Sequence, residues 1–348
     1  MRLDRLFVSG TGVALPRRSS VEEAVAEGLC DPRAARRMRM RSVCVSDGES
    51  GPELAVRAAC QALRRAGARP GDIDLVLHAD TYHQGHDLWA PASYVQRESV
   101  GNACPALEVR QLSNGGMAAL ELAASHLLAD SARRGALVTT GDRFCLPGFD
   151  RWNTDPGTVC GDGGTALVLS ARGGFARLLS LCTVSDPGLE AMGRGDDPFS
   201  DAPLEARVPI GVEKHRAVLT RELGMGELLE RLLGGQRAAL DGALAEAGVT
   251  KEAVDWFVLP HLGRPRMEFQ FFQPLGIAPE RSTWSWGSGV GHLGAGDAFA
   301  GLHHLAVEGQ LRPGGLCALV SSGAGFAWTV AVLEISGRPS TGEDEGVS

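Results

Sequence analysis

The chain has 348 residues, of which 44% are hydrophobic, so it is long enough to bury a large core in one big domain or in two of ordinary size. No apolar stretch approaches the ~18 residues that a membrane-spanning helix needs. A formal net charge of −8 gives no general reason to expect binding to nucleic acid or to an anionic membrane.

The N-terminal segment begins Met-Arg-Leu-Asp, so an acidic residue interrupts the apolar run that a signal peptide requires. We therefore expect a soluble, cytoplasmic protein. A basic cluster follows at Arg36, Arg37, Arg39 and Arg41. Taken alone, such a charge run most often forms a solvated helix face.

Eight cysteines are spread along the chain without a close Cys-x-x-Cys pair. This spacing speaks against a zinc site and against a disulfide framework. We expect no metal site and reduced, mostly buried thiols. The cysteines are Cys30, Cys44, Cys60, Cys104, Cys145, Cys160, Cys182 and Cys317.

The chain contains an internal repeat. Residues 62–77 match residues 243–258 without a gap, and residues 136–141 match residues 318–323 at nearly the same displacement. Each copy of the longer segment has helical periodicity up to a glycine, then a short polar turn and a buried apolar strand. The repeat therefore predicts two related halves, each built from alternating helices and strands.

We place these halves at residues 1–172 and 173–348. Their alternating elements favour an α/β class with layers of helices on largely parallel sheets. Residues 186–209 are rich in Gly, Pro and Asp and are interpreted as an inserted loop region that caps the core. Walls of a substrate site are expected there.

The same displacement brings together three residues that could act in catalysis. It carries Ser113 to Gly294, which lies two residues after His292, and Asp297 opens the predicted helix that follows. Related halves usually pack about a two-fold axis, so we expect Ser113 and His292 to meet. The predicted helix after Ser113 would also favour negative charge at its N-terminus.

These residue types are typical of nucleophilic catalysis by serine. A serine hydroxyl needs an adjacent base, and an aspartate can orient that histidine and stabilise its charged form. The glycines at 294 and 296 would let the loop fold back between His292 and Asp297. Each residue also has a structural interpretation: Ser113 as a helix N-cap, His292 as a buried core histidine and Asp297 as an ordinary first-turn acid.

Two further positions are candidates. His261 follows a predicted buried strand, at the strand end where α/β folds place ligands, which makes it a candidate to face the site. The glycine-rich run at residues 321–326 lacks the Lys-Ser/Thr ending of a phosphate loop. Its glycines would allow close backbone approach, which suits an oxyanion donor.

Several segments together resemble the β-ketoacyl-[acyl-carrier-protein] synthase III family of the thiolase superfamily, over nearly the whole chain. The resemblance implies a thiolase fold, in which duplicated α/β halves form a five-layered αβαβα architecture. The segments are residues 39–41, 108–116, 160–166, 260–261, 291–292 and 323–328.

In that family a cysteine occupies the position of Ser113, a histidine that of His261 and an asparagine that of His292. The family's His and Asn pair stabilises the enolate that forms when malonyl loses CO₂, so the change at His292 puts condensation in doubt. Ser113, His292 and Asp297 together resemble a hydrolase-style triad instead. A branch in actinomycete polyketide pathways is similar in this respect; its members select starter units or transfer acyl groups.

The resemblance also implies a homodimer and a pantetheine tunnel that reaches Ser113. Acyl-CoA or an acyl carrier protein would be substrates, with no further cofactor. The backbone N–H groups of Ser113 and Ala324 would form the oxyanion hole, and Trp89 would bound the acyl pocket. The acidic carrier protein would dock on basic side chains, for which the candidates are Arg36, Arg39 and Arg266.

Three functions stay open at this point. The first is an acyltransferase that passes an acyl group from Ser113 to a carrier thiol, a hydroxyl or an amine. The second is a starter-unit ketosynthase that condenses the acyl group with malonyl-ACP, with His261 assisting decarboxylation. The third is a catalytically silent partner subunit in a synthase complex, in which Ser113 merely fills the position of the cysteine.

Overall fold

A nine-stranded mixed sheet forms the frame of the computed structural model, which describes residues 1–205 and 207–340. Its strand order is β5-β4-β6-β7-β1-β8-β11-β10-β9, and β2 and β3 form a separate pair. The strands are β1 (Arg2–Ala14), β2 (Arg18–Ser20), β3 (Ser42–Cys44), β4 (Leu75–Ala79), β5 (Ala106–Val109), β6 (Gly135–Asp142), β7 (Gly163–Ser170), β8 (Ala176–Ser185), β9 (Trp256–Val258), β10 (Leu316–Gly323) and β11 (Ala327–Ile335).

The strand order repeats itself about the sheet centre. From the β1–β8 pair outward, β1, β7, β6 and β4 on one side correspond to β8, β11, β10 and β9 on the other. The two copies of each repeated segment occupy corresponding strands, β4 with β9 and β6 with β10. A division near residue 172 would fall between β7 and β8, and the two-domain assignment stays a prediction.

The sheet is less parallel than the alternation predicts. Only the β4–β5, β4–β6 and β9–β10 pairs are parallel, whereas β1 pairs antiparallel with both β7 and β8. The difference arises because β7 and β11 return antiparallel beside β6 and β10 instead of crossing over through a helix.

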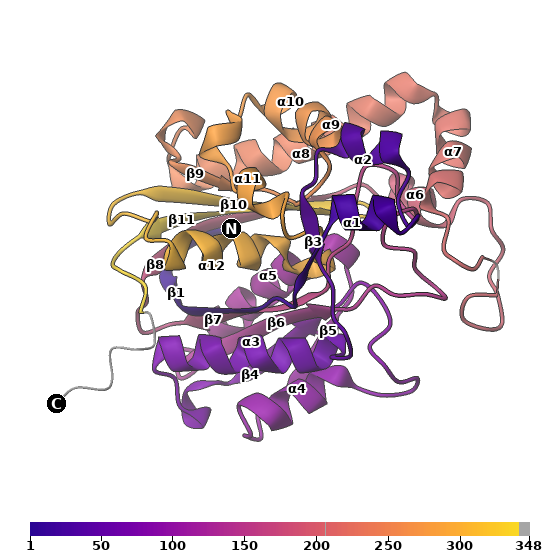
Figure 1. The fold of residues 1–348 in the computed structure, drawn as a ribbon. Helices are drawn as coiled ribbons and strands as arrows, with labels where there is room; N and C mark the ends of the chain where they lie inside the picture. Colours follow the sequence, from indigo (N-terminus) through magenta and orange to yellow (C-terminus); the bar gives the residue numbers. More distant parts are fainter. Residues whose placement is uncertain (206, 341–348) are drawn as a thin grey trace.

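Helices lie in three layers around the sheet (Figure 1). Helix α3 packs on β1, β6 and β7, α8 packs on β8 and β11, and α5 and α12 lie between the two parts of the sheet. This is the expected αβαβα arrangement. The helices are α1 (Val21–Ala26), α2 (Pro32–Met38), α3 (Gly51–Ala66), α4 (Pro91–Ser99), α5 (Gly115–Leu128), α6 (Ala191–Arg194), α7 (Val212–Leu223), α8 (Met225–Ala247), α9 (Arg264–Met267), α10 (Gln273–Leu275), α11 (Trp284–Gly287) and α12 (Asp297–Val307).

The repeated helix-to-strand units end in the same way. Helix α3 ends at Gly67 with a φ of 59°, and α8 ends at Gly248 with a φ of 70°. Both values are left-handed, which a glycine adopts without steric cost, so each helix stops before the turn that leads to β4 or β9. Buried apolar side chains then continue through each strand into the core.

The region between β8 and α8 is more helical than a loop. Among the described residues of 186–209, the helical parts are a 3-10 turn at Pro187–Leu189 and α6, and α7 follows directly and packs against both α6 and α8. Helix α7 buries His215 and Leu219 on one face. The cap over the core is therefore a short helical layer.

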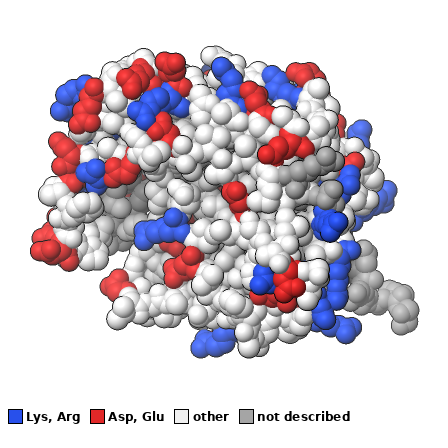
Figure 2. All heavy atoms as spheres, turned by 180° about the vertical axis from the view of Figure 1, so that it is seen from behind, with Lys and Arg blue, Asp and Glu red and all other residues white. Residues whose placement is uncertain are grey.

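The molecular surface carries charges of both signs. Figure 2 shows basic and acidic side chains interspersed over one face rather than gathered into one large field. Among the described residues, no helix is long and apolar enough to cross a membrane.

Candidate active site

Ser113 lies in a tight connection between a strand and a helix. Strand β5 ends at Val109, a 3-10 turn covers Leu112–Asn114, and α5 begins at Gly115. Leu112 has a φ of 47°, a left-handed value that is costly for a residue with a branched side chain. The strained turn presents Ser113 at the N-terminal end of α5.

Two helix N-termini pack against each other at this point because their glycines leave room. A Cβ on Gly116 would lie 2.5 Å from the carbonyl oxygen of Ala295, and a Cβ on Gly115 would lie 3.3 Å from the Cβ of Ala295. The first distance is too short for a real side chain, and the second is already tight. The glycines therefore allow α5 and the turn before α12 to approach closely.

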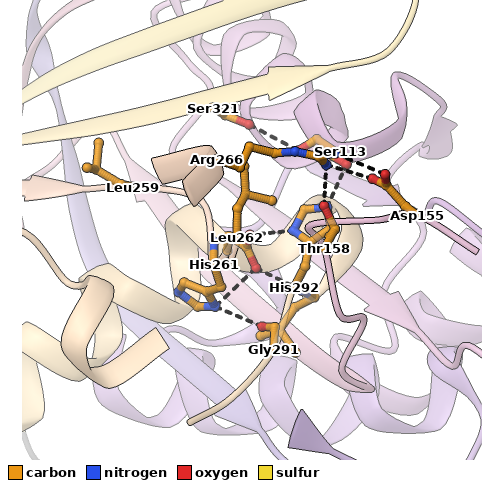
Figure 3. Close-up of polar contacts among 12 residues, drawn as sticks. Ser113, Asp155, Thr158, Leu259, His261, Leu262, Arg266, Gly291, His292 and Ser321 are labelled. Carbon is orange, nitrogen blue, oxygen red and sulfur yellow. Dashed lines mark hydrogen bonds and ion pairs between the residues drawn. The ribbon is translucent and has the colours of Figure 1, made fainter. Parts of the chain in front are cut away.

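This approach places Ser113 beside His292 (Figure 3). Oγ of Ser113 lies 2.8 Å from Nε2 of His292, and Nδ1 of His292 lies 2.5 Å from Oδ2 of Asp297. The carboxylate can only accept, so Nδ1 carries the proton and Nε2 is left to accept from the serine hydroxyl. The three side chains form a Ser-His-Asp relay.

Asp297 is held by several donors. Its Oδ2 also accepts the backbone N–H of His261 at 2.9 Å, and its Oδ1 accepts the backbone N–H of Leu293 at 2.8 Å. The backbone folds back at Gly294, where φ is 59°, so a residue five positions after His292 can reach its ring. This is the reversal that the glycines at 294 and 296 predict.

The electrostatics favour charge on this pair. Burial alone would lower the pKa of His292, but the Asp297 carboxylate and the more distant Asp155 and Asp142 outweigh it and raise the pKa above its usual value. Burial would raise the pKa of Asp297, yet His261 and His292 bring it down to about 2. Asp297 is therefore ionised at neutral pH and stabilises a protonated His292.

The β10–β11 turn closes the other side of Ser113. Oγ of Ser321 donates to the backbone carbonyl of Ser113 at 3.0 Å. A Cβ on Gly323 would lie 2.6 Å from the backbone nitrogen of Asn114, so the end of β10 lies directly against the nucleophile turn. Ala324 follows and lines the same cavity as Ser113.

A cavity of about 660 Å³ opens at Ser113 and His292. One wall is polar and is formed by side chains of the loop after β6, of α7 and of α9. Another part of the lining is apolar and is formed mainly by α8. The polar members include Asp155, Thr158, Arg216 and Arg266, and the apolar members include Met225, Leu228, Leu229, Leu232 and Phe326.

Arg266 belongs to this wall rather than to an open docking surface. Its guanidinium makes two contacts with Asp155, at 2.7 and 3.0 Å, and donates to Oγ1 of Thr158 and to the carbonyl of Pro156. Arg216 of α7 also pairs with Asp155, at 2.5 and 3.0 Å. Despite burial, the two arginines hold the pKa of Asp155 well below its usual range.

Other predicted residues lie outside the cavity. Trp89 is 37% exposed and packs beside His86 and Tyr94, and the residues that line the cavity do not include it. Arg36 and Arg39 are exposed on and after α2, which contacts α9. His261 is fully buried and is not part of the lining.

Sequence reasoning missed Asp155 and Arg216. Asp155 lies in an irregular loop. Arg216 lies in a helix that was not predicted, because the segment before it is rich in Gly and Pro. The one available signal was the helical spacing of Glu213, Arg216, Thr220 and Arg221, which all line the cavity on α7.

Burial disfavours cysteine chemistry at this site. Burial raises the pKa of Cys160, next to the backbone of His292, well above its usual value, which disfavours a thiolate. Within residues 1–205 and 207–340, no group of His, Cys, Asp and Glu side chains is arranged to hold a metal ion.

Sequence comparisons identify relatives over 94% of the chain. Residues 244–335 match the family described as 3-oxoacyl-[acyl-carrier-protein (ACP)] synthase III C terminal. The β-ketoacyl-[acyl-carrier-protein] synthase III of Rhizorhabdus wittichii is 30% identical over 337 residues, with 94% of this chain and 99% of the relative covered. The enzyme of the same name from Chelativorans sp. is 29% identical over 338 residues, with the same coverage.

Structural comparisons agree. The acyltransferase ChlB3 is 36% identical with a TM-score of 0.91, and the match covers 97% of this chain and 99% of ChlB3. The 3-oxoacyl-[acyl-carrier-protein] synthase III of Aquifex aeolicus is 20% identical with a TM-score of 0.76, covering 94% and 99%. That lower identity shows the fold alone, which is the thiolase fold that the sequence predicts.

Proposed function

The chain belongs to the β-ketoacyl-[acyl-carrier-protein] synthase III family, and from that premise we propose that it is an acyltransferase that carries an acyl group as an ester of Ser113. The observation that carries the proposal is the relay from Ser113 through His292 to Asp297, with contacts of 2.8 and 2.5 Å. The relay opens onto a cavity large enough for an extended substrate.

The first half-reaction forms the ester. Oγ of Ser113 attacks the carbonyl carbon of an acyl thioester while Nε2 of His292 takes the hydroxyl proton. The tetrahedral oxyanion is stabilised by the backbone N–H groups of Ser113 and Ala324, beside the N-terminus of α5. The C–S bond then breaks, and the protonated His292 returns its proton to the leaving thiolate.

The second half-reaction removes the acyl group from Ser113. A thiol, hydroxyl or amine of the acceptor gives its proton to Nε2 of His292 and attacks the ester carbonyl. The C–O bond to Ser113 breaks, and Oγ takes back the proton from His292. Asp297 keeps the imidazole oriented and compensates its positive charge in both half-reactions.

The proposed donor is acyl-CoA or an acyl carrier protein, and no cofactor takes part. The relatives are synthases named for an acyl carrier protein, and ChlB3 is itself described as an acyltransferase. Arg36 and Arg39 are exposed and have no charged partner among the described residues, so they suit an acidic carrier protein. We place the chain in the serine branch of polyketide and antibiotic biosynthesis.

A homodimer is part of the proposal. Strand β5 is an edge of the large sheet, and Leu107 on it is 56% exposed. Leu88 and Trp89 add exposed apolar surface on the segment before α4, which itself packs on β5. An apolar sheet edge invites pairing, and a second copy of the chain would cover it.

Intact-protein mass spectrometry tests the ester. Purified enzyme is exposed to a panel of acyl-CoA and acyl-carrier thioesters, and the Ser113→Ala variant is treated in parallel. We expect the wild type to gain the mass of one acyl group and the variant to gain none, because the attacking oxygen is missing. An adduct of equal yield on Ser113→Ala would contradict the proposal.

A ketosynthase is the second candidate, because the named relatives are β-ketoacyl-[acyl-carrier-protein] synthases. It would use the same acyl-Ser113 but join it to the carbanion of malonyl-ACP with release of CO₂. His261 is turned away from the cavity, which disfavours its participation in that decarboxylation. The absence of any adduct with the whole panel would favour the silent partner subunit instead.

A further inference from the structure

His261 lies beside the relay but faces away from the cavity. Its neighbours Pro260 and Leu262 line the cavity, whereas His261 does not and is fully buried. The backbone makes a tight turn at His261, where the N–H of Leu262 donates to the carbonyl of Pro260 at 3.0 Å, and the ring is turned into the interior behind Asp297. Figure 3 shows the ring of His261 on the side of Gly291, away from Ser113.

The contacts of the ring define its protonation. Nδ1 lies 3.0 Å from the backbone carbonyl oxygen of Gly291 and 3.2 Å from Oδ1 of Asp297. A carbonyl oxygen can only accept, so Nδ1 carries the proton and donates it to Gly291, with the Asp297 carboxylate close beside it. The backbone N–H of His261 meanwhile donates to Oδ2 of the same aspartate.

The other ring nitrogen meets a closed interior. Nε2 of His261 has no hydrogen-bond partner among the described residues. A Cβ on Gly287 would lie 2.4 Å from the ring, and Trp286 packs edge-on at 5.3 Å. A second proton on Nε2 would find no acceptor, and buried charge without a partner is costly. The neutral ring with its proton on Nδ1 is therefore the stable form.

We propose that His261 is a positioning residue for the acyl transfer described above, and this inference rests on that proposed function. Its backbone N–H donates to Oδ2 of Asp297, and the Nδ1–H of its neutral ring lies 3.2 Å from Oδ1, so that the carboxylate stays directed at Nδ1 of His292. The histidine that the family's pattern offers for decarboxylation is thereby used in this chain as a support for the aspartate.

The charges around the two histidines are consistent with a positioning role for His261 and a proton-transfer role for His292. The titratable groups that face His261 are Asp297 and His292 on the cavity side, and His304 of α12, which stacks on Trp286 at 4.5 Å. His292 in turn faces Asp155 and Asp142. Burial lowers the pKa of His261, whereas the pKa of His292 is raised. Only His292 is suited to exchange protons with the substrate.

A pair of matched variants tests the role. In His261→Leu the donor is lost, so we expect kcat to fall by about 10–100-fold, as for other groups that orient a catalytic histidine from behind, with KM little changed. Asp297 loses a compensating donor, so the acid limb of the kcat/KM profile should move to higher pH. His261→Asn keeps an N–H near the place of Nδ1 and should retain most of the activity.

Nuclear magnetic resonance of ¹⁵N-histidine-labelled wild-type enzyme tests the same inference without any substitution. We expect His261 to keep the neutral Nδ1–H form from pH 5 to pH 9. A ring that titrates in this range, an Asn variant as impaired as the Leu variant, or a change confined to KM would overturn the positioning role. Absence of a Ser113 adduct would instead overturn the proposed function, so the two failures are distinguishable.

Discussion

At the scale of single residues, the proposed acyl transfer depends on how Asp297 controls His292. The aspartate is ionised, with a pKa of about 2, and its charge offsets the burial that would otherwise keep the imidazole neutral. The base must be neutral to accept the proton of Ser113. The raised pKa of His292 therefore predicts that kcat/KM increases with pH, with a midpoint above the usual histidine value.

Asp297→Asn should change both the rate and the pH profile. We expect kcat to fall by roughly 10⁴-fold, because an amide can stabilise the wrong tautomer of His292. The remaining activity should have its acid limb at lower pH, since burial still lowers the pKa of His292 and no carboxylate opposes it. A pH–rate series on both proteins checks the sign; an acid limb that moves upward contradicts it.

Thiol alkylation is a second test at this scale. Iodoacetamide should modify the exposed Cys145 and leave Ser113-dependent activity intact, because no cysteine occupies the nucleophile position. Cys160 is buried and its raised pKa keeps it unreactive. Peptide mapping of the labelled enzyme should show this pattern. Rapid inactivation when one iodoacetamide label is bound per chain would contradict the serine mechanism.

The relay of Ser113, His292 and Asp297 could be predicted from the sequence, but the polar wall of the cavity could not. Ser113 and His292 could be paired because the repeat related two helix starts, and the glycines at 294 and 296 indicated the fold-back to Asp297. The cluster of Asp155, Arg216 and Arg266 joins three segments that are far apart in the sequence. Its side-chain contacts leave no periodic pattern in the sequence from which they could be predicted. His261 was left undecided because its direction depends on the local path of the backbone.

At the scale of elements, the close packing of the two helix N-termini positions the relay. A methyl group on Gly116 would collide with the backbone of Ala295, which cannot move aside without shifting the turn before α12. We expect Gly116→Ala to lower the free energy of unfolding by about 1–3 kcal/mol, as in other overpacked cores, and to reduce acylation by separating Ser113 from His292.

Gly234→Ala is the matched control. Gly234 lies within α8 and a Cβ there has no atom within 4 Å. Alanine is the better helix former, so this variant should be as stable as the wild type or more stable by up to about 1 kcal/mol. Urea unfolding and acyl-adduct yields on both variants make the comparison. Equal stability and equal adduct yields in the two variants would show that the contact is unimportant.

Element prediction succeeded where local signals and core periodicity agreed. The helix-stop glycines and the apolar runs that follow them located the α3–β4 and α8–β9 units in both copies. Strand direction was less accessible, because whether β7 and β11 return beside their neighbours is decided by long-range pairing. Helix α7 was not predicted, because a partly exposed helix beside a cavity has only a weak hydrophobic periodicity.

At the scale of the whole molecule, the edge of the sheet predicts the assembly. Leu107→Asp places a charge on the exposed edge strand β5. We expect the wild type to be a dimer and the variant to be a monomer with unchanged helix and strand content, since Leu107 contributes little to the core. Light scattering combined with size-exclusion chromatography measures this. A wild-type monomer at micromolar concentration would contradict the proposed dimer.

The most direct test of acyl transfer is the fate of the acyl group on Ser113. Acyl-enzyme prepared with a ¹³C-labelled acyl thioester is freed of donor and split between unloaded carrier protein and malonyl-ACP, and mass spectra and released CO₂ are recorded. We expect the labelled acyl group to move unchanged from Ser113 to the carrier thiol, without CO₂ release. Consumption of the adduct only with malonyl-ACP, with one CO₂ per acyl group, would contradict it and identify a condensing enzyme.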